Sequence, residues 1–345
     1  MWIDFKNLNM NILQPDDDFG QKVRQFIEEW LSPGKTVPVQ TSGSTGAPKI
    51  FQIEKENMKH SARMTCDFLG LSPGDTALLC LPLEYISGKM MVVRAMERNL
   101  MLHVRPPSLQ PLEGLHGEID FCAMTPLQVE HSLDQLHLIK NLIIGGAQVS
   151  ASLINTIEQQ SGNRNPAQRI FETYGMSETL SHIALKEIYP KREVYFTVFE
   201  GIEIDQDERG CLMIKAPQLN QDVLITNDLV ELRNEKQFRF LGRTDHIINS
   251  GGAKIFPEQL EALVRQKIPA EVLFVGADDE VLGQKLVLVI EGFYFSEDEI
   301  REKLKTVPFE KSFHQPKEII FVKEIPRTPN GKVNRNALRN IIRDL

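Results

Sequence analysis

The sequence predicts an α/β protein with two domains: a large N-terminal domain with mostly parallel sheets and helices plus a small antiparallel β region, and a small α+β C-terminal domain. Three observations predict this class. Short apolar runs alternate with helical segments from residue 76 to 175, short alternating segments continue to residue 242, and new helices and strands fill the rest. A chain of 345 residues is long enough to form two hydrophobic cores.

The region 76–175 has the pattern of parallel βαβ units. Its apolar runs end near a Pro or Gly, and segments with helical periodicity lie between them. Ligands of such sheets bind at the carboxyl ends of the strands. The predicted strands are 76–83, 120–126, 141–147 and 169–175, and the predicted helices are 87–99, 126–137 and 150–160.

The rest of the chain changes character twice. Segments 193–204, 210–216 and 237–242 predict a small antiparallel sheet or barrel. The C-terminal part predicts helices at 257–266, 296–305 and 336–345 and strands at 271–277, 285–292 and 317–326. Ser296 and Glu299 predict a capping box, and the last helix carries its apolar face on Ala337, Leu338, Ile341, Ile342 and Leu345. We place the domain boundary near Asp245, which gives domains 1–244 and 245–345.

Composition narrows the function classes. The net charge of −8 disfavours general nucleic-acid binding, which needs a basic face. The four cysteines (Cys66, Cys80, Cys122 and Cys211) form no close pair, so a disulfide framework or zinc site is disfavoured. No apolar run reaches the roughly 18 residues of a spanning helix, and the N-terminal residues do not resemble a signal peptide. We therefore expect a cytoplasmic protein without a membrane partner.

The stretch TSGSTGAPK has the composition of a phosphate-binding turn. Its glycines let the backbone approach a ligand, its hydroxyls and N–H groups can donate to an anion, and Lys49 adds a positive charge. It is not a Walker A motif, because Ile50 stands where Ser or Thr would hold Mg²⁺. On turn chemistry alone, a flexible surface turn is the alternative. The candidate phosphate-binding residues are Thr41, Ser42, Gly43, Ser44, Thr45, Gly46 and Lys49.

Four further motifs follow this turn in order: YGMSET (174–179), TNDLVEL (226–232), GRTDHIINSGGAKIFPEQLE (242–261) and PRTPNGKVNR (326–335). Together the five motifs resemble the adenylate-forming superfamily of acyl- and aryl-CoA synthetases, luciferases and peptide-synthetase adenylation domains. The resemblance implies an AMP-forming acid–thiol ligase that uses ATP, Mg²⁺ and coenzyme A. It also implies a mobile C-terminal domain and an N-terminal domain shorter than usual, because only forty residues precede Thr41.

The resemblance implies a nucleotide site at the strand ends. Glu178 would bind Mg²⁺, as a hard oxygen ligand can, Ser177 would contact the α-phosphate, and Tyr174 would pack on adenine. Asp228 would accept both ribose hydroxyls, with Arg243 as a second contact. The alternatives from the residues alone are an acidic helix cap with a core tyrosine, and a surface Asp–Arg ion pair. The remaining expected nucleotide contacts are Gly145, Gly146, Ala147, Gly175 and Met176.

The resemblance implies two half-reactions, formation of an acyl-adenylate and its conversion to a CoA thioester. The C-terminal motifs would serve both. Lys332 would be the adenylation lysine, because an ammonium between a carboxylate and the α-phosphate offsets their repulsion. Asp245 would be the hinge of a domain rotation. Gly251 and Gly252 would leave space for the pantetheine arm of CoA. An exposed surface lysine is the alternative interpretation of Lys332.

Segment 81–99 indicates which carboxylic acid would be the substrate. It is similar to that of the o-succinylbenzoate–CoA ligases of menaquinone biosynthesis, with Tyr85 where His is commoner. The resemblance places Tyr85, Ser87, Gly88, Lys89 and Gly146 near the acyl group, and gives catalytic roles to Tyr85, Lys49, Glu178 and Lys332. The alternatives are another aryl- or acyl-CoA ligase, an enzyme that loads a carrier protein, or a non-catalytic nucleotide-binding protein. A homodimer is a candidate cover for the sheet flank that the short N-terminal region leaves open.

Overall fold

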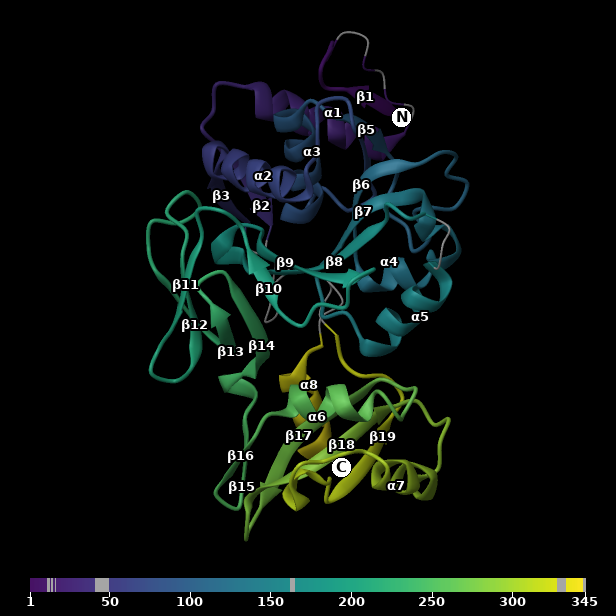
Figure 1. Ribbon diagram of the computed structural model, residues 1–345, viewed down its shortest axis with the longest axis vertical. Coiled ribbons are helices and arrows are strands. Elements are labelled where there is room, and N and C mark those ends of the chain that lie inside the picture. Colours follow the sequence, from purple (N-terminus) through teal and green to yellow (C-terminus); the bar gives the residue numbers. More distant parts are fainter. Residues whose placement is uncertain are drawn as a thin grey trace.

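The computed structural model describes residues 1–10, 13, 15, 17–40, 50–161, 165–327 and 333–343. These residues form a large sheet with helices on both faces and a smaller α+β unit beyond one edge of it (Figure 1). The predicted fold class is therefore confirmed. Within the described ranges, no helix is long and apolar enough to cross a membrane.

The large sheet has twelve strands in the order β1-β5-β4-β6-β7-β8-β9-β10-β14-β13-β12-β11. Strands β5, β4, β6, β7 and β8 are parallel, and the others are antiparallel to their neighbours. The predicted antiparallel region is continuous with the parallel part, because β8 pairs with β9. The strands are β1 Trp2–Asp4, β4 Thr76–Leu79, β5 Met101–Val104, β6 Ile119–Met124, β7 Ile139–Ile144, β8 Arg169–Gly175, β9 His182–Tyr189, β10 Phe196–Val198, β11 Glu203–Gln206, β12 Cys211–Lys215, β13 Leu224–Asn234 and β14 Gln237–Arg243.

Two hydrophobic clusters cover the two faces of the parallel part. Along β6, Phe121 and Ala123 face one cluster, while Cys122 and Met124 face the other. This alternation buries the strand on both faces, as parallel sheets require. The first cluster includes residues of α1 Asp18–Leu31, α2 Lys55–Leu69 and α3 Ile86–Arg98, and the second includes residues of α4 Pro126–Glu130 and α5 Ala151–Ser161.

The prediction of one continuous helix over 126–137 is wrong. The structure divides it into α4 and a 3-10 helix at Leu133–Leu138. Ser132 lies between them with a non-helical φ of −125°. The break lets Leu136 pack in the same buried cluster as Val129 although the chain has turned between them.

The smaller unit contains β15 Ile248–Ser250, β16 Ala253–Ile255, β17 Val272–Asp279, β18 Gly283–Glu291 and β19 Glu318–Val322, with α6 Pro257–Val264, α7 Glu297–Lys305 and α8 Arg335–Arg343. The capping box of Ser296 and Glu299 at α7 is confirmed. On α8, Leu338 and Ile342 are buried as predicted, but Ile341 is exposed. Leu345 lies outside the described residues.

Strand β1 forms one end of the large sheet. It pairs with β5 at the end of the parallel part, and Trp2 stacks on His103 with ring centroids 4.4 Å apart. A separate pair of strands, β2 Thr36–Gln40 and β3 Ile50–Glu54, lies beside α2 and brings Gln40 into a parallel bridge with Tyr85. These two strands flank residues 41–49.

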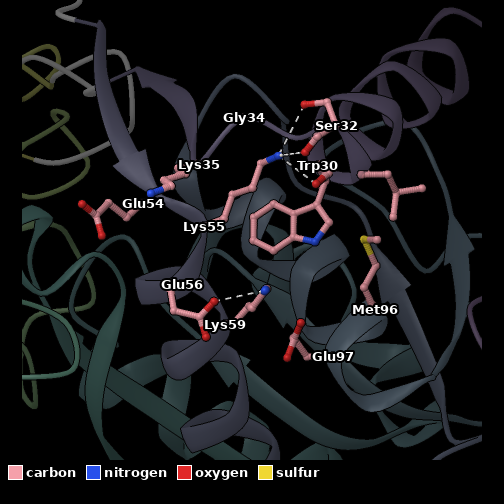
Figure 2. A pocket seen from close by; sticks show the side chains of 11 residues that line it. Trp30, Ser32, Gly34, Lys35, Glu54, Lys55, Glu56, Lys59, Met96 and Glu97 are labelled. Atoms are coloured by element: carbon pink, nitrogen blue, oxygen red, sulfur yellow. Dashed lines mark hydrogen bonds and ion pairs between the residues drawn. The ribbon is translucent and has the colours of Figure 1, made fainter.

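Lys55 connects α2 to the end of α1. Its ammonium is buried with the side chain (8% exposed) and donates to the carbonyl oxygens of Glu29, Trp30 and Ser32 at 2.8–2.9 Å. Figure 2 shows the contacts with Trp30 and Ser32. The last carbonyls of a helix have no partner within the helix and carry its negative dipole end. Lys55, on the neighbouring helix α2, therefore caps the C-terminal end of α1. The surface pocket around it includes Lys59 and none of the predicted site residues.

Replacing Lys55 by Met is expected to lower the free energy of unfolding by about 2–4 kcal/mol, because three carbonyls lose a charged donor. Denaturant unfolding followed by tryptophan fluorescence measures it, since both tryptophans, Trp2 and Trp30, lie in the large domain. Lys59→Met is the matched control, because the one ion pair of Lys59 in the described part of the chain is with the exposed Glu56. Equal destabilisation by the two variants would rule out the helix-capping role.

Candidate active site

Two strand ends bring the predicted nucleotide motifs together. Strands β7 and β8 are parallel neighbours, so Gly145 after β7 and Gly175 at the end of β8 lie at the same edge of the sheet. Ser177 and Glu178 follow in a short 3-10 helix, Ser177–Thr179, and both are exposed. The structure thus presents a hydroxyl and a carboxylate at the edge where α/β proteins bind ligands.

Close backbone packing explains the glycines at this edge. A Cβ on Gly175 would lie 2.5 Å from both the Cα of His182 and the carbonyl oxygen of Ser181, so no side chain fits. A Cβ on Gly145 would lie 2.7 Å from Oγ1 of Thr173. Gly146 has a φ of +90°, which favours glycine, and among the described residues only a methyl group of Thr125 would lie within 4 Å of a Cβ there. The turn after β7 is therefore narrow and leaves open space at Gly146, with Ala147 beside it.

Tyr174, Asp228 and Arg243 form one hydrogen-bonded group. The Tyr174 hydroxyl donates to Oδ2 of Asp228 at 2.6 Å, and Nη1 of Arg243 donates to Oδ1 at 2.9 Å. Asp228 and Arg243 are paired across β13 and β14. Because Asp228 is only 7% exposed, this group is not an ordinary surface ion pair.

The surroundings of Tyr174 fix its ring and its proton. The ring packs edge-on against Phe238, with centroids 4.8 Å apart, and also contacts Phe196 and Phe240. Burial and the neighbouring Asp228 carboxylate raise the pKa of the Tyr174 hydroxyl well above its usual value. The phenol therefore stays protonated and acts as a hydrogen-bond donor to Asp228.

Arg243 also contacts the expected hinge. Its Nε and Nη2 donate to the two carboxylate oxygens of Asp245, each at 2.9 Å. The hydrogen bond with Asp245, together with the charge of Asp228, raises the pKa of Arg243 above its usual value. One guanidinium thus links the buried carboxylate of the site with the residue expected to lie at the domain boundary.

The segment predicted to surround the acyl group is used mostly for packing. Tyr85 precedes α3 and is half-buried, and Ser87 is exposed. A Cβ on Gly88 would lie 2.2 Å from the carbonyl oxygen of Pro82, so α3 needs a glycine to approach that loop. The ammonium of Lys89, which the resemblance places near the acyl group, donates to the carbonyl of Pro38 at 2.7 Å and lies 5.0 Å from the ring centroid of Phe26. Burial lowers the pKa of Lys89.

Arg94 is a candidate site residue that the sequence interpretation missed. It lies on α3, is 2% exposed, and donates to Oγ of Ser181 at 3.0 Å. Within the described residues it forms no ion pair with a carboxylate, and its Nε has no hydrogen-bond partner. Burial lowers the pKa of its guanidinium to about 10, so it remains charged at neutral pH. The only signal in the sequence is one arginine within the apolar run MMVVRAM.

The neighbours of Arg94 do not neutralise its charge. Ser181 lies 3.4 Å from Nδ1 of His182, whose Nε2 contacts Thr65 at 3.1 Å. Burial, with the charge of Arg94, holds the pKa of His182 well below its usual value, so the imidazole is neutral. A buried cation without an anionic partner lowers the stability of the folded protein, and an anionic ligand that pairs with the cation offsets this cost. Because the Ser181 backbone lies against Gly175, this cation is next to the strand end that carries Ser177 and Glu178.

Two parts of the expected site lie outside the described residues. They are the phosphate-binding turn (Thr41, Ser42, Gly43, Ser44, Thr45, Gly46 and Lys49) and the lysine Lys332. The described neighbours of Lys332 are Arg327 and Val333, which form a bridge, and α8 begins at Arg335. In Figure 1, α6 and α8 lie on the side of the smaller unit that faces the large sheet.

Comparison with known proteins agrees with this arrangement. Residues 7–204 match the family described as AMP-binding enzyme, and residues 259–332 match the AMP-binding enzyme C-terminal domain. The chain belongs to the AMP-binding enzyme family.

Two curated relatives have the same name. The 2-succinylbenzoate–CoA ligase of Listeria monocytogenes is 24% identical over 353 residues, which cover 92% of this chain and 72% of that protein. The 2-succinylbenzoate–CoA ligase of Lactococcus lactis is 26% identical, and the alignment covers 88% of this chain and 70% of that protein.

Solved structures share the fold. An acyl-CoA synthetase (AMP-forming)/AMP-acid ligase II-like protein from Dyadobacter fermentans has a TM-score of 0.67 at 34% identity, and the alignment covers 99% of each chain. The o-succinylbenzoate coenzyme A synthetase of Bacillus subtilis, in complex with ATP and magnesium, has a TM-score of 0.73 at 22% identity. That alignment covers 88% of this chain and 69% of the Bacillus chain.

Proposed function

We propose that this enzyme joins o-succinylbenzoate to coenzyme A in two steps, through an acyl-adenylate formed from ATP. The names of the curated relatives support this acid. The observation that carries the choice is Arg94, a buried cation with no carboxylate partner among the described residues. o-Succinylbenzoate has two carboxylates, and the one that does not react needs such a cation.

The group at the strand ends suits the nucleotide. Asp228, held by Tyr174 and Arg243, would accept the ribose hydroxyls, and the open turn at Gly145, Gly146 and Ala147 would admit the base. Glu178 is an exposed hard oxygen donor beside Ser177, which fits a Mg²⁺ shared with phosphate oxygens. Bound there, Mg²⁺ would neutralise phosphate charge as pyrophosphate leaves. Gly175 and Met176 would line the same cleft.

The C-terminal residues would separate the two steps. Lys332 would contact the substrate carboxylate and the α-phosphate during adenylation, and rotation at Asp245 between domains 1–244 and 245–345 would then withdraw it. The end of β14 at Arg243 and the start of the small sheet at Ile248 leave a short connection for this rotation. Gly251 and Gly252 form a positive-φ turn between β15 and β16, where a Cβ on Gly252 would meet nothing within 4 Å. That open turn would receive the pantetheine arm of CoA.

The proposal extends to location and assembly. An enzyme that consumes ATP and CoA belongs in the cytoplasm, where both are supplied. A homodimer through β1 would extend the sheet at its exposed end, where Trp2 is half-exposed. Sedimentation at low and high protein concentration tests this assembly, and a monomer at both would exclude it.

Arg94→Met is expected to remove the preference for the diacid. The substrates to compare are o-succinylbenzoate and 3-benzoylpropionate, which has the same reacting chain but no ring carboxylate. We expect wild type to prefer the diacid by about 10²-fold or more in kcat/KM, because only the diacid gains an ion pair between its second carboxylate and the buried cation. In the Arg94→Met variant the two acids should become nearly equal, with the monoacid rate little changed. Arg94→Lys should keep part of the preference.

Pyrophosphate release measures both rates. Arg98→Met is the matched control on the same helix, because Arg98 pairs with the exposed Asp67. A wild type that uses both acids equally would exclude the proposed substrate. An Arg94→Met variant that loses both activities by the same factor would show that Arg94 only supports the fold.

A further inference from the structure

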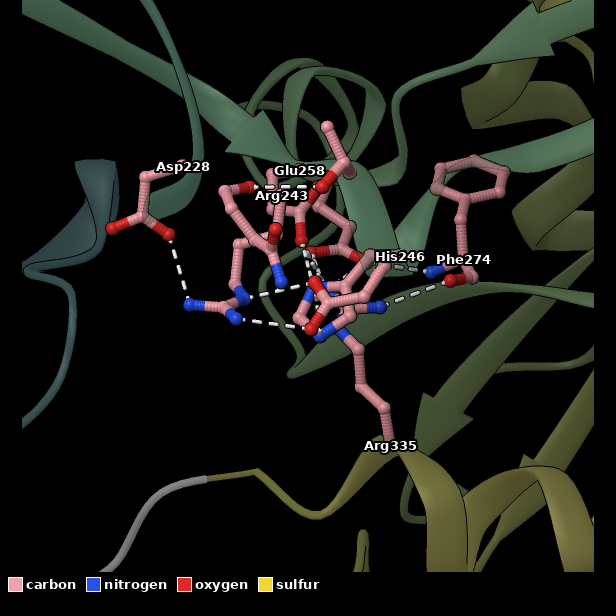
Figure 3. Close-up of polar contacts among 10 residues, drawn as sticks. Asp228, Arg243, His246, Glu258, Phe274 and Arg335 are labelled. Atoms are coloured by element: carbon pink, nitrogen blue, oxygen red, sulfur yellow. Dashed lines mark hydrogen bonds and ion pairs between the residues drawn. The ribbon is translucent and has the colours of Figure 1, made fainter. Parts of the chain in front are cut away.

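The boundary between the two units contains a cluster of charged contacts that the nucleotide site does not explain. It lies between β14, the residues after Arg243, and helices α6 and α8 (Figure 3). On one side Arg243 holds Asp228 and Asp245, and on the other Arg335 holds Glu261 with two hydrogen bonds of 2.8 and 2.7 Å. Figure 3 shows His246 and Glu258 in the same cluster as Arg243 and Arg335.

His246 and Glu258 join the two sides. Nδ1 of His246 contacts Oε1 of Glu258 at 2.5 Å, and its Nε2 lies 3.9 Å from Oδ1 of Asp245. Arg335 adds a weaker contact, with Nη2 lying 3.8 Å from the same Glu258 oxygen. Although burial raises the pKa of Glu258, the hydrogen bond from His246 and the charge of Arg335 outweigh it and hold the pKa below its usual value. The Glu258 carboxylate is therefore ionised at the boundary.

Gly242 makes room for this carboxylate. A Cβ at position 242 would lie 2.8 Å from Oε2 of Glu258, and Gly242 has a φ of +149°. The Glu258 carboxylate thus packs directly against the backbone of β14 at Gly242, a contact that we call the Glu258 seat. Gly242 precedes Asp245 in the sequence and Glu258 follows it. Oε2 of Glu258 is buried and has no hydrogen-bond partner among the described residues. The contact with Gly242 therefore shields this oxygen from water but gives it no hydrogen-bond donor. A rotation at Asp245 would move Glu258 away from Gly242 and would break this contact.

We propose that Glu258, oriented by His246, is a positioning residue that favours the domain orientation used for adenylation. The inference rests on the proposed two-step function. In this orientation α8, which begins three residues after Lys332, faces the large sheet. Glu258 acts through the placement of Lys332 and touches no substrate. Its seat on Gly242 must open before the small domain can turn for thioester formation.

Glu258→Gln is expected to change the two half-reactions unequally. Loss of one charged hydrogen bond is of the size that shifts a conformational equilibrium by about tenfold. Pyrophosphate exchange into ATP should therefore fall by about tenfold, while thioester formation from supplied acyl-adenylate stays within about twofold. Glu297→Gln on α7, where Glu297 pairs with exposed Arg301, is the matched control and should change neither rate.

Gly242→Ala provides a second variant, because its added methyl group pushes the carboxylate from its seat. It should change the ratio of half-reactions in the same direction, and thermal unfolding reports any separate loss of fold. Spin labels at the exposed residues Glu203 and Glu302 give an independent distance between the two units. We expect Glu258→Gln to broaden this distance distribution in the absence of ligand.

An equal loss in both half-reactions, or an unchanged distance distribution, would overturn the positioning role. Failure of the proposed substrate gives a different result. If wild type is inactive with o-succinylbenzoate but exchanges pyrophosphate with another acid, the substrate is wrong. The half-reaction ratio measured with that acid still decides the role of Glu258.

Discussion

Lys332→Ala is expected to lower acyl-adenylate formation by about 10²- to 10³-fold and to leave thioester formation from supplied acyl-adenylate within about twofold. The substrate carboxylate and the α-phosphate are both anionic and repel each other as they meet. A positioned ammonium stabilises the charge that develops between them, and removal of one such donor has effects of this size. In the second half-reaction the repulsion is absent, because the acyl group is already joined to AMP.

Pyrophosphate exchange and thioester formation measure the two steps separately. Lys323→Ala is the matched control, because Lys323 is an exposed lysine of the same domain, nine positions before Lys332 in the chain. It should leave both steps unchanged. If Lys332→Ala reduced the rates of the two steps by the same factor, the lysine would not be specific to adenylation. That result would contradict a rotation at Asp245 that withdraws Lys332 before the second step.

Asp228→Ala is expected to impair both half-reactions, by about 10²- to 10⁴-fold in kcat/KM. Each hydrogen bond between a ribose hydroxyl and a carboxylate is worth about 1.5–3 kcal/mol, and AMP remains bound in the second step. The loss also frees the Tyr174 hydroxyl and one side of Arg243 from their acceptor. The pattern therefore differs from that of Lys332→Ala, which affects one step only.

Two controls separate binding from folding at Asp228. Asp228→Asn keeps the shape of the side chain but removes its charge and one of its two acceptor oxygens, so either Tyr174 or Arg243 loses its partner. It should lose most activity, and thermal unfolding measures the accompanying loss of stability separately. Asp205→Ala, on the exposed edge strand β11, should leave activity unchanged. A fully active Asp228→Asn variant would show that the carboxylate does not hold the ribose.

Local patterns predicted most of the elements, because their causes lie close together in the sequence. The runs 120–126, 141–147 and 169–175 are apolar because each strand is buried on both faces, and they became β6, β7 and β8. The capping box of Ser296 and Glu299 depends on residues three positions apart. The helix over 126–137 failed at Ser132, where tertiary packing outweighs helical periodicity.

Contacts between distant residues could not be predicted in the same way. The pairing of β8 with β9 joins the antiparallel strands to the main sheet, and no local pattern distinguishes it from a separate barrel. Motif order brought Tyr174, Asp228 and Arg243 into consideration, but only the fold shows one buried hydrogen-bonded group. The hydrogen bond from the Lys89 ammonium to the Pro38 carbonyl also joins residues that are far apart in the sequence, so no local pattern predicts it.

The missing partner of Arg94 is the clearest case. A sequence shows that an arginine is present, whereas the absence of a nearby carboxylate among the described residues is a property of the folded chain. The same holds for Glu258 on Gly242, where residues of two units meet across the boundary. These two features are the ones that extend the account beyond family membership.

The products of the complete reaction show whether the enzyme works through an acyl-adenylate. The enzyme is incubated with o-succinylbenzoate, MgATP and coenzyme A, and the nucleotides and thioester are separated and quantified. We expect one AMP and one pyrophosphate for each o-succinylbenzoyl-CoA formed. Formation of ADP and phosphate in place of AMP and pyrophosphate would contradict an acyl-adenylate pathway.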